Sequence, residues 1–114
     1  MRDTTKFFPN LKLPVIAAPM FLVSGPEIVK ACCREGVIGA FPFQNARTIE
    51  QLDGWMDELR RDVSQTDAPI AVNLTTHSSY DRLADEIALI ENHKPEIVIT
   101  ALGGPEPVLD VVHG

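Results

Sequence analysis

Short apolar runs alternate with segments of helical periodicity four times along this chain. Each run is apolar almost throughout and is interrupted only by glycine, asparagine or threonine, which is typical of parallel strands buried on both faces. The predicted strands are Val15–Ala18, Val37–Phe41, Ile70–Leu74 and Ile97–Ala101. Because helical segments separate them, the pattern predicts the order βαβαβαβα with right-handed crossovers.

The first two helices have recognisable start signals. Ser24-Gly25-Pro26-Glu27 reads as a capping box, in which Ser24 accepts from a backbone amide and Glu27 reaches back. This helix is expected to run to Glu35 and to end at Gly36, which can take the left-handed conformation. Thr48-Ile49-Glu50-Gln51 repeats the signal, and an apolar stripe then extends to Val63.

The last two helices are predicted from their apolar stripes. Residues 80–90 place apolar side chains three or four apart, beginning at Tyr80. A fourth helix is expected to begin near Pro105. The residues that it should bury are Val108, Leu109 and Val112.

Two architectures fit this α/β pattern. One is a small open sheet with helices on both faces, which 114 residues can complete. The other is a (β/α)8 TIM barrel, which typically needs about 250 residues, so that this chain supplies its first four βα units. The uncharged run Ile97–Ile99 lacks the charges that normally protect a sheet edge, and the sequence ends where a fourth helix should lead to a fifth strand. We therefore expect residues 1–114 to be the truncated N-terminal half of one barrel domain.

Composition and charge narrow the range of partners. Hydrophobic residues make up 45% of the chain and charged residues 23%, which is typical of a soluble globular protein. The net charge is −6, and no basic stripe is present, so a nucleic-acid partner is not expected. The longest apolar run, Leu13–Val23, is too short and too interrupted by proline to span a bilayer. No secretory signal precedes it, so a cytoplasmic location is expected.

The cysteines and histidines suggest no chemistry. Cys32 and Cys33 are adjacent, an arrangement that suits neither a disulfide framework nor a metal site, so we expect them to pack as small apolar residues. His77 is expected in an exposed loop after the third strand. His93 and His113 lie at or near helix C-termini, where a cation is favourable without any catalytic role.

Candidate ligand-binding residues lie at the carboxyl ends of the predicted strands, where parallel α/β folds bind ligands. Pro19, Met20 and Phe21 are apolar residues in a place where a polar loop is expected. They suit either a flat aromatic ligand or a plug closing the barrel mouth. Asn73 is a polar side chain in an apolar strand, and its amide either binds a ligand, which we favour, or bridges neighbouring backbone.

Other polar residues at these ends give weaker signals. Gln44 and Asn45 are interpreted as turn residues. Gly103-Gly104 lacks both the G-x-G-x-x-G and the Walker patterns and is interpreted as a tight turn before a helix. No nucleophile triad, carboxylate pair or metal-ligand cluster is evident.

Several motifs together resemble one family. The run from Leu13 to Met20 followed by Val23-Ser24-Gly25-Pro26-Glu27 is similar to the N-terminal signature of the nitronate monooxygenases, formerly called 2-nitropropane dioxygenases. Residues 36–42, 71–74 and 97–103 continue the similarity in the expected order. The resemblance covers the chain from about residue 11 onward.

The resemblance implies a flavoprotein built on a TIM barrel. The family binds FMN and oxidises alkyl nitronates with O₂ to a carbonyl compound and nitrite. Position by position, Ala18, Pro19 and Met20 would run alongside the flavin ring, and Asn73 would be an FMN contact. The family's catalytic histidine and its phosphate-binding loops belong to the second half of the barrel, and no residue of this chain matches them. The fragment is therefore expected to be inactive alone.

Two alternatives stay open. A flavin-dependent enoyl reductase shares the barrel and the Ala-Pro-Met strand end. A complete, non-catalytic α/β binding module is the second. The barrel interpretation further predicts bare sheet edges, so we expect the isolated chain to form homo-oligomers, to aggregate or to associate with its missing half.

Overall fold

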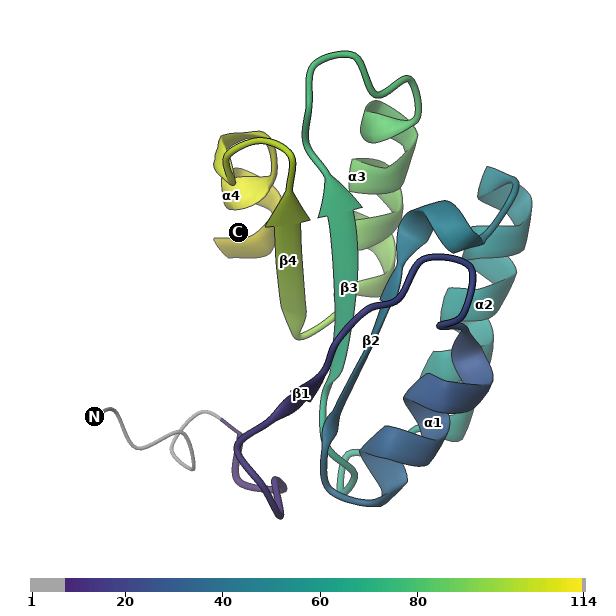
Figure 1. Ribbon diagram of the computed structural model, residues 1–114, viewed down its shortest axis with the longest axis vertical. Coiled ribbons are helices and arrows are strands. Elements are labelled where there is room, and N and C mark those ends of the chain that lie inside the picture. The colour runs from purple at the N-terminus through teal and green to yellow at the C-terminus, as the bar shows by residue number, and fades with distance from the viewer. Residues whose placement is uncertain (1–7, 114) are drawn as a thin grey trace.

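The computed structural model describes residues 8–113, which form a four-stranded parallel sheet with helices between the strands. Each strand pairs in parallel with the next one along the chain, in the order β1-β2-β3-β4 (Figure 1). The strands are β1 (Ile16–Ala17), β2 (Ile38–Pro42), β3 (Ile70–Thr75) and β4 (Ile97–Ala101). The predicted βαβαβαβα order is confirmed, and a sheet wound in one direction is the arrangement of a barrel.

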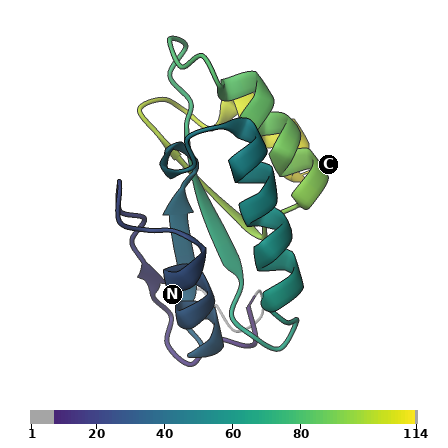
Figure 2. The same cartoon turned by 90° about the vertical axis from the view of Figure 1, so that its right-hand side faces the viewer.

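All the helices pack on one face of this sheet (Figure 2). They are α1 (Pro26–Arg34), the 3₁₀ turn η2 (Phe43–Asn45), α2 (Ile49–Asp62), α3 (Leu83–His93) and α4 (Glu106–His113). Val29 of α1, Ile90 of α3 and Val108 of α4 belong to one buried cluster, together with residues of η2 and α2. Consecutive helices also contact each other. The open sheet with helices on both faces is therefore excluded for the described residues.

The two faces of the sheet have different packing partners. Strand residues alternate, so that Phe41 and Val72 face the helices while Ala40 and Ala71 face the other side. On that second side, among residues 8–113, Leu11 and strand residues form a small cluster. The second side corresponds to the interior of a barrel, and the helices form its outer layer.

The two predicted capping boxes have different outcomes. Thr48 caps α2 as predicted, with its Oγ1 accepting from the backbone N–H of Gln51 at 3.0 Å. The Ser24 prediction is wrong, because the N-cap of α1 is Gly25 and no side chain caps that helix. Ser24 instead accepts a hydrogen bond from the Met20 N–H at 2.8 Å, so the hydroxyl serves the preceding loop.

Helix boundaries and faces were predicted with small errors. Gly36 follows α1 with a φ of 80°, as expected of a helix-ending glycine. α3 begins at Leu83, three residues after the predicted start, because residues 80–82 form the turn that precedes it. In α4 the prediction that Leu109 and Val112 are buried is wrong. Val108 and its neighbour one turn later, Val111, face the core instead.

Candidate functional site

The register of the sheet brings polar side chains together at the carboxyl end of its inner face. Asn73 pairs with Pro42 of β2 and with Ile99 of β4, and it lies on the same face as Ala71. Thr75 is two residues further along β3 and therefore faces the same side. The inner face is thus apolar toward its amino end and polar at the rim where parallel folds bind ligands.

The Asn73 amide is half-buried and makes one hydrogen bond within the described residues. Its Nδ2 donates to the backbone oxygen of Ile99 at 3.0 Å. Backbone bridging, one of the two roles considered for this side chain, is therefore observed. The Oδ1 atom makes no hydrogen bond within residues 8–113, so it can accept one from a ligand.

Gln44 extends this polar rim. Its Nε2 donates to the hydroxyl of Thr75 at 2.9 Å, joining the turn after β2 to the end of β3. The sequence predicts only a turn role for Gln44, since nothing in the chain indicates that its amide reaches a neighbouring strand.

Asn45 has a larger role than a turn residue, and sequence analysis missed it. Its Nδ2 donates to the backbone oxygens of Met20 at 2.9 Å and Ser24 at 2.7 Å. Its Oδ1 accepts from the Leu22 N–H at 2.9 Å. One amide side chain therefore contacts three residues of the loop between β1 and α1, which the Ser24 hydroxyl and two backbone bonds to the Met20 carbonyl also hold. The only sequence signal was an asparagine after a strand, which does not reveal such a long-range contact.

The loop held by Asn45 exposes apolar side chains. Met20 is 42% exposed, and Phe21, Leu22 and Val23 are more exposed still. Leu22 has a φ of 66°, a left-handed conformation that costs a non-glycine residue roughly 1–2 kcal/mol. A strained and exposed apolar loop does not form a packed plug over the described strand ends. It presents an apolar surface beside the polar rim.

Within the described residues, neither His77 nor His93 makes a side-chain hydrogen bond to these rim residues. His77 is exposed, and its Nδ1 accepts from the Ser79 N–H at 3.1 Å, as expected of a loop residue. His93 ends α3 on the helical layer, where its Nε2 lies 2.6 Å from Asp53 and its Nδ1 3.8 Å from Asp57. Each ring nitrogen faces a different carboxylate, and the three side chains form a polar contact between α2 and α3.

Cys33 has the structural role that was expected, whereas Cys32 is only partly buried. Cys33 is fully buried in the main core, and its Sγ lies 3.4 Å from the backbone oxygen of Pro69. Burial raises the pKa of its thiol to about 11, which leaves little reactive thiolate at neutral pH.

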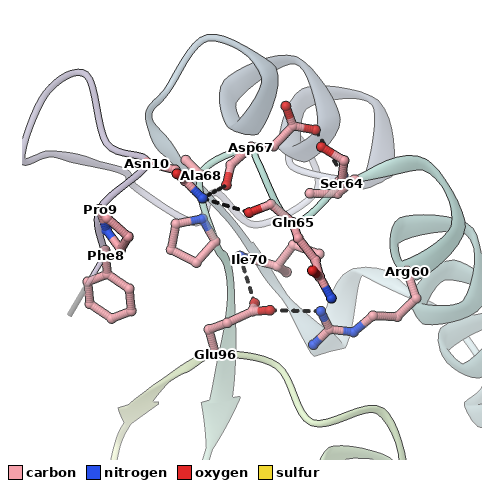
Figure 3. Close-up of a pocket in the computed structure, with 12 residues that line it drawn as sticks. Phe8, Pro9, Asn10, Arg60, Ser64, Gln65, Asp67, Ala68, Ile70 and Glu96 are labelled. Carbon is pink, nitrogen blue, oxygen red and sulfur yellow. Dashed lines mark hydrogen bonds and ion pairs between the residues drawn. The ribbon is translucent and has the colours of Figure 1, made fainter. Parts of the chain in front are cut away.

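A cavity of about 240 Å³ lies at the opposite, amino end of the sheet (Figure 3). Its polar groups bind one another. Arg60 pairs with Glu96 at 2.8 Å, and the other Glu96 oxygen accepts from the Ile70 N–H at 3.0 Å. Asn10 donates to the backbone oxygen of Gln65 at 2.6 Å. These polar groups bond one another, and the strand carboxyl ends, where parallel folds bind ligands, lie at the other end of the sheet. The cavity is therefore not the candidate ligand site.

The topology and the rim define the class of this protein. The described residues form part of a (β/α)8 barrel with a candidate ligand-binding face at the carboxyl ends of its strands. Within the described residues no helix is long and apolar enough to cross a membrane.

Comparison with solved structures supports this fold. The chain superposes on FabK from Thermotoga maritima with a TM-score of 0.76 and 21% sequence identity, over 96% of this chain and 33% of that one. For its M276A mutant the TM-score is 0.78 and the identity 20%, over 99% of this chain and 36% of that one. The chain therefore spans about a third of the length of these structures. No protein-family model and no curated protein matches it.

Proposed function

We propose that this chain is the N-terminal part of an FMN-binding barrel oxidoreductase whose complete form oxidises alkyl nitronates with O₂. The observation that carries the proposal is the meeting of two features at one end of the sheet. The apolar segment Ala18–Met20 follows β1, and the free Oδ1 of Asn73 lies at the same end of β3. The resemblance of these segments to nitronate monooxygenases supplies the cofactor and the substrate class, and the FabK likeness supports the barrel.

The residues present fit one wall of a flavin site. A flavin ring has broad apolar faces and a polar edge with both donors and acceptors. The exposed Met20 side chain and the small Ala18 and Pro19 suit the faces, whereas the Asn73 oxygen suits an N–H on the edge. The Met20 backbone N–H and carbonyl are already bonded to Ser24 and Asn45, so Met20 would contribute its side chain.

Each residue would have a binding or orienting role. Ala18, Pro19 and Met20 would exclude water from one side of the ring. Asn73, fixed by its bond to the Ile99 carbonyl, would orient the ring edge. The flavin, when bound, supplies the redox chemistry by accepting electrons from the substrate and passing them to O₂. The catalytic proton acceptor would come from the rest of the barrel, because none of the histidines matches it.

The enoyl reductase alternative uses the same wall. Either enzyme would contact its flavin through the same four residues, Ala18, Pro19, Met20 and Asn73. These residues therefore support a flavoprotein, whereas the nitronate substrate is proposed from the family resemblance alone. A non-catalytic binding module would place no flavin there, and ligand titration separates it from both.

The partner proposed for the isolated chain is a second copy of itself. β1 and β4 each pair on one side only within the described residues, and the inner face is covered only by Leu11 and neighbouring strands. Unpaired edges next to exposed apolar residues favour association between copies.

The test is an FMN titration followed by flavin fluorescence. We expect weak but saturable quenching. Asn73→Ala should lower the FMN affinity about fivefold, because it removes one hydrogen bond of about 1 kcal/mol. Asn10→Ala is the matched control, because it removes an amide at the opposite end of the sheet. Absence of saturable quenching, or an equal effect of both substitutions, would contradict the proposal.

A further inference from the structure

A fully buried carboxylate lies behind the candidate site, in the first turns of α3. The Glu86 side chain is 0% exposed. Its Oε2 accepts from the Tyr80 hydroxyl at 2.5 Å and lies 3.0 Å from the Arg82 Nε. Its Oε1 makes no hydrogen bond within the part of the chain that the structure describes. Burying an incompletely bonded carboxylate is costly, and an apolar residue of similar size would often stabilise the core more. Stability alone therefore does not account for Glu86.

The arginine held by Glu86 reaches across to the turn after β2. Arg82 Nη1 donates to the backbone oxygen of Ala46 at 2.8 Å, and Nη2 donates to that of Phe43 at 3.4 Å. These two carbonyls flank the η2 turn. The Glu86–Arg82 contact is an ion pair by distance, because the Arg82 Nε makes no hydrogen bond of normal geometry within the described residues. Since the guanidinium is a rigid plane, a carboxylate beside its Nε favours one direction for the Nη groups.

The same η2 turn bonds the loop after β1. Asn45, the last residue of η2, bonds the backbone of Met20, Leu22 and Ser24. A continuous path of polar contacts therefore runs from Glu86 through Arg82 and η2 to the exposed Met20 segment. It joins the first three βα units of the chain.

We propose that Glu86 is a positioning residue, which holds the Met20 loop in its ligand-facing conformation through Arg82 and Asn45. The left-handed φ of Leu22 is strained and persists only where surrounding contacts hold it. The path from Glu86 to Asn45 supplies such contacts. That this loop conformation matters for flavin binding rests on the proposed function. The coupling itself does not, and it can be measured without a ligand.

The test uses methionine methyl NMR on the 114-residue protein. The chain contains Met1, Met20 and Met56, so selective methyl labelling gives one reporter in the loop and one, Met56, in the buried core. In Glu86→Gln we expect the Met20 methyl resonance to shift and Leu22 amide exchange to accelerate about tenfold, as the loop opens locally. The Met56 resonance should stay in place.

Two further variants define the path. Asn45→Ala should reproduce the Met20 shift, and the Glu86→Gln/Asn45→Ala double variant should add nothing, because both act along one path. Glu96→Gln is the matched control, since it breaks another Arg–Glu pair at the opposite end of the sheet and should leave Met20 unchanged. If Glu86→Gln does not fold, Tyr80→Phe removes only one hydroxyl donor and should shift Met20 in the same direction by less.

The proposal is overturned if Met20 does not move in the folded variant, or if Met56 moves with it as in general loosening. The FMN titration separates this result from the proposed function. Suppose that Glu86→Gln shifts Met20 but that Asn73→Ala does not change FMN affinity. The proposed flavin site would then be wrong, and the coupling between Glu86 and the Met20 loop would still be supported. If Asn73→Ala weakens FMN binding but Glu86→Gln leaves the Met20 resonance in place, only the proposed role of Glu86 is contradicted.

Discussion

Gly39 of β2 lies directly against the backbone of Val29 in α1. A Cβ atom at position 39 would stand 2.6 Å from the Val29 carbonyl oxygen and 2.9 Å from its Cα. Neither atom can move without shifting the helix. This contact lets α1 lie close to the sheet, and α1 begins directly after the loop that carries Met20.

Gly39→Ala should therefore destabilise the protein by about 1–3 kcal/mol, the usual cost of overpacking a core. Gly54→Ala is the matched control, because Gly54 lies within α2 and a Cβ there meets no atom within 4 Å. That substitution should stabilise the protein by about 0.5–1 kcal/mol through helix propensity. Urea unfolding measures both changes, and equal effects would show that the close approach is absent.

Loss of the α2 cap should have a measurable cost. Thr48→Ala removes the acceptor for the Gln51 N–H and should lower the free energy of unfolding by about 1 kcal/mol. Thr48→Ser keeps the hydroxyl and should cost clearly less. If chemical denaturation gives the same loss for both substitutions, the hydroxyl is not acting as a cap.

The buried Glu86 should impose a pH dependence on stability. Burial raises its pKa above the ordinary value of 4.5, although Tyr80 and Arg82 oppose this shift. The folded protein then binds the proton more tightly than the unfolded chain, so this residue contributes most at low pH and progressively less as pH rises above the ordinary value. The stability of the wild-type protein relative to Glu86→Gln should therefore fall as pH rises above the ordinary pKa of 4.5.

Asp62 provides a control of opposite sign. Hydrogen bonding to Lys30 lowers the pKa of Asp62, so its contribution is present above the ordinary value and is lost as pH falls. The stability of the wild-type protein relative to Asp62→Asn should rise with pH only in unfolding curves recorded at and below the ordinary pKa of 3.8, and it should stay level above that value. Parallel slopes for the two variants would contradict both assignments.

The isolated 114-residue protein should not retain FMN through purification. The candidate residues would contact one side of the flavin ring, and none of them is assigned to the FMN phosphate. The affinity for FMN should therefore be poor, even if the ring fits this surface well. A visible absorption spectrum checks this directly. A stoichiometric yellow chromophore on the purified protein would show that the chain holds the cofactor by itself.

Association between copies should depend on the free edge of β1. Val15, just before β1, is 46% exposed, and Val15→Lys places a charge beside the unpaired edge, where it should lower the sedimentation coefficient toward that of a monomer. Ala31→Lys adds the same charge on the exposed side of α1 and should change nothing. A wild-type protein that sediments as a monomer would refute the association.

Sequence patterns predicted the fold where the physical signal is local. Four apolar runs, the Thr48 cap and the Gly36 terminator depend on neighbouring residues, and all are confirmed. The Ser24 capping box failed because the same four letters also permit a hydroxyl that bonds backward to Met20. Periodicity could not choose between Leu109 and Val111 as the buried face of α4, because apolar residues occupy adjacent positions there.

The sequence by itself determined the strands, the helices and the polar residue within β3, since each follows from the period of its own segment. Only the tertiary structure decided that every helix lies on one face and that Asn45 and Glu86 serve the loop of Met20. These contacts join residues up to 25 positions apart for Asn45 and 39 for Arg82. A short sequence pattern carries no information about contacts between residues so far apart in the chain. The parallel pairing of the strands creates these contacts, because it brings the carboxyl ends of the strands to one rim.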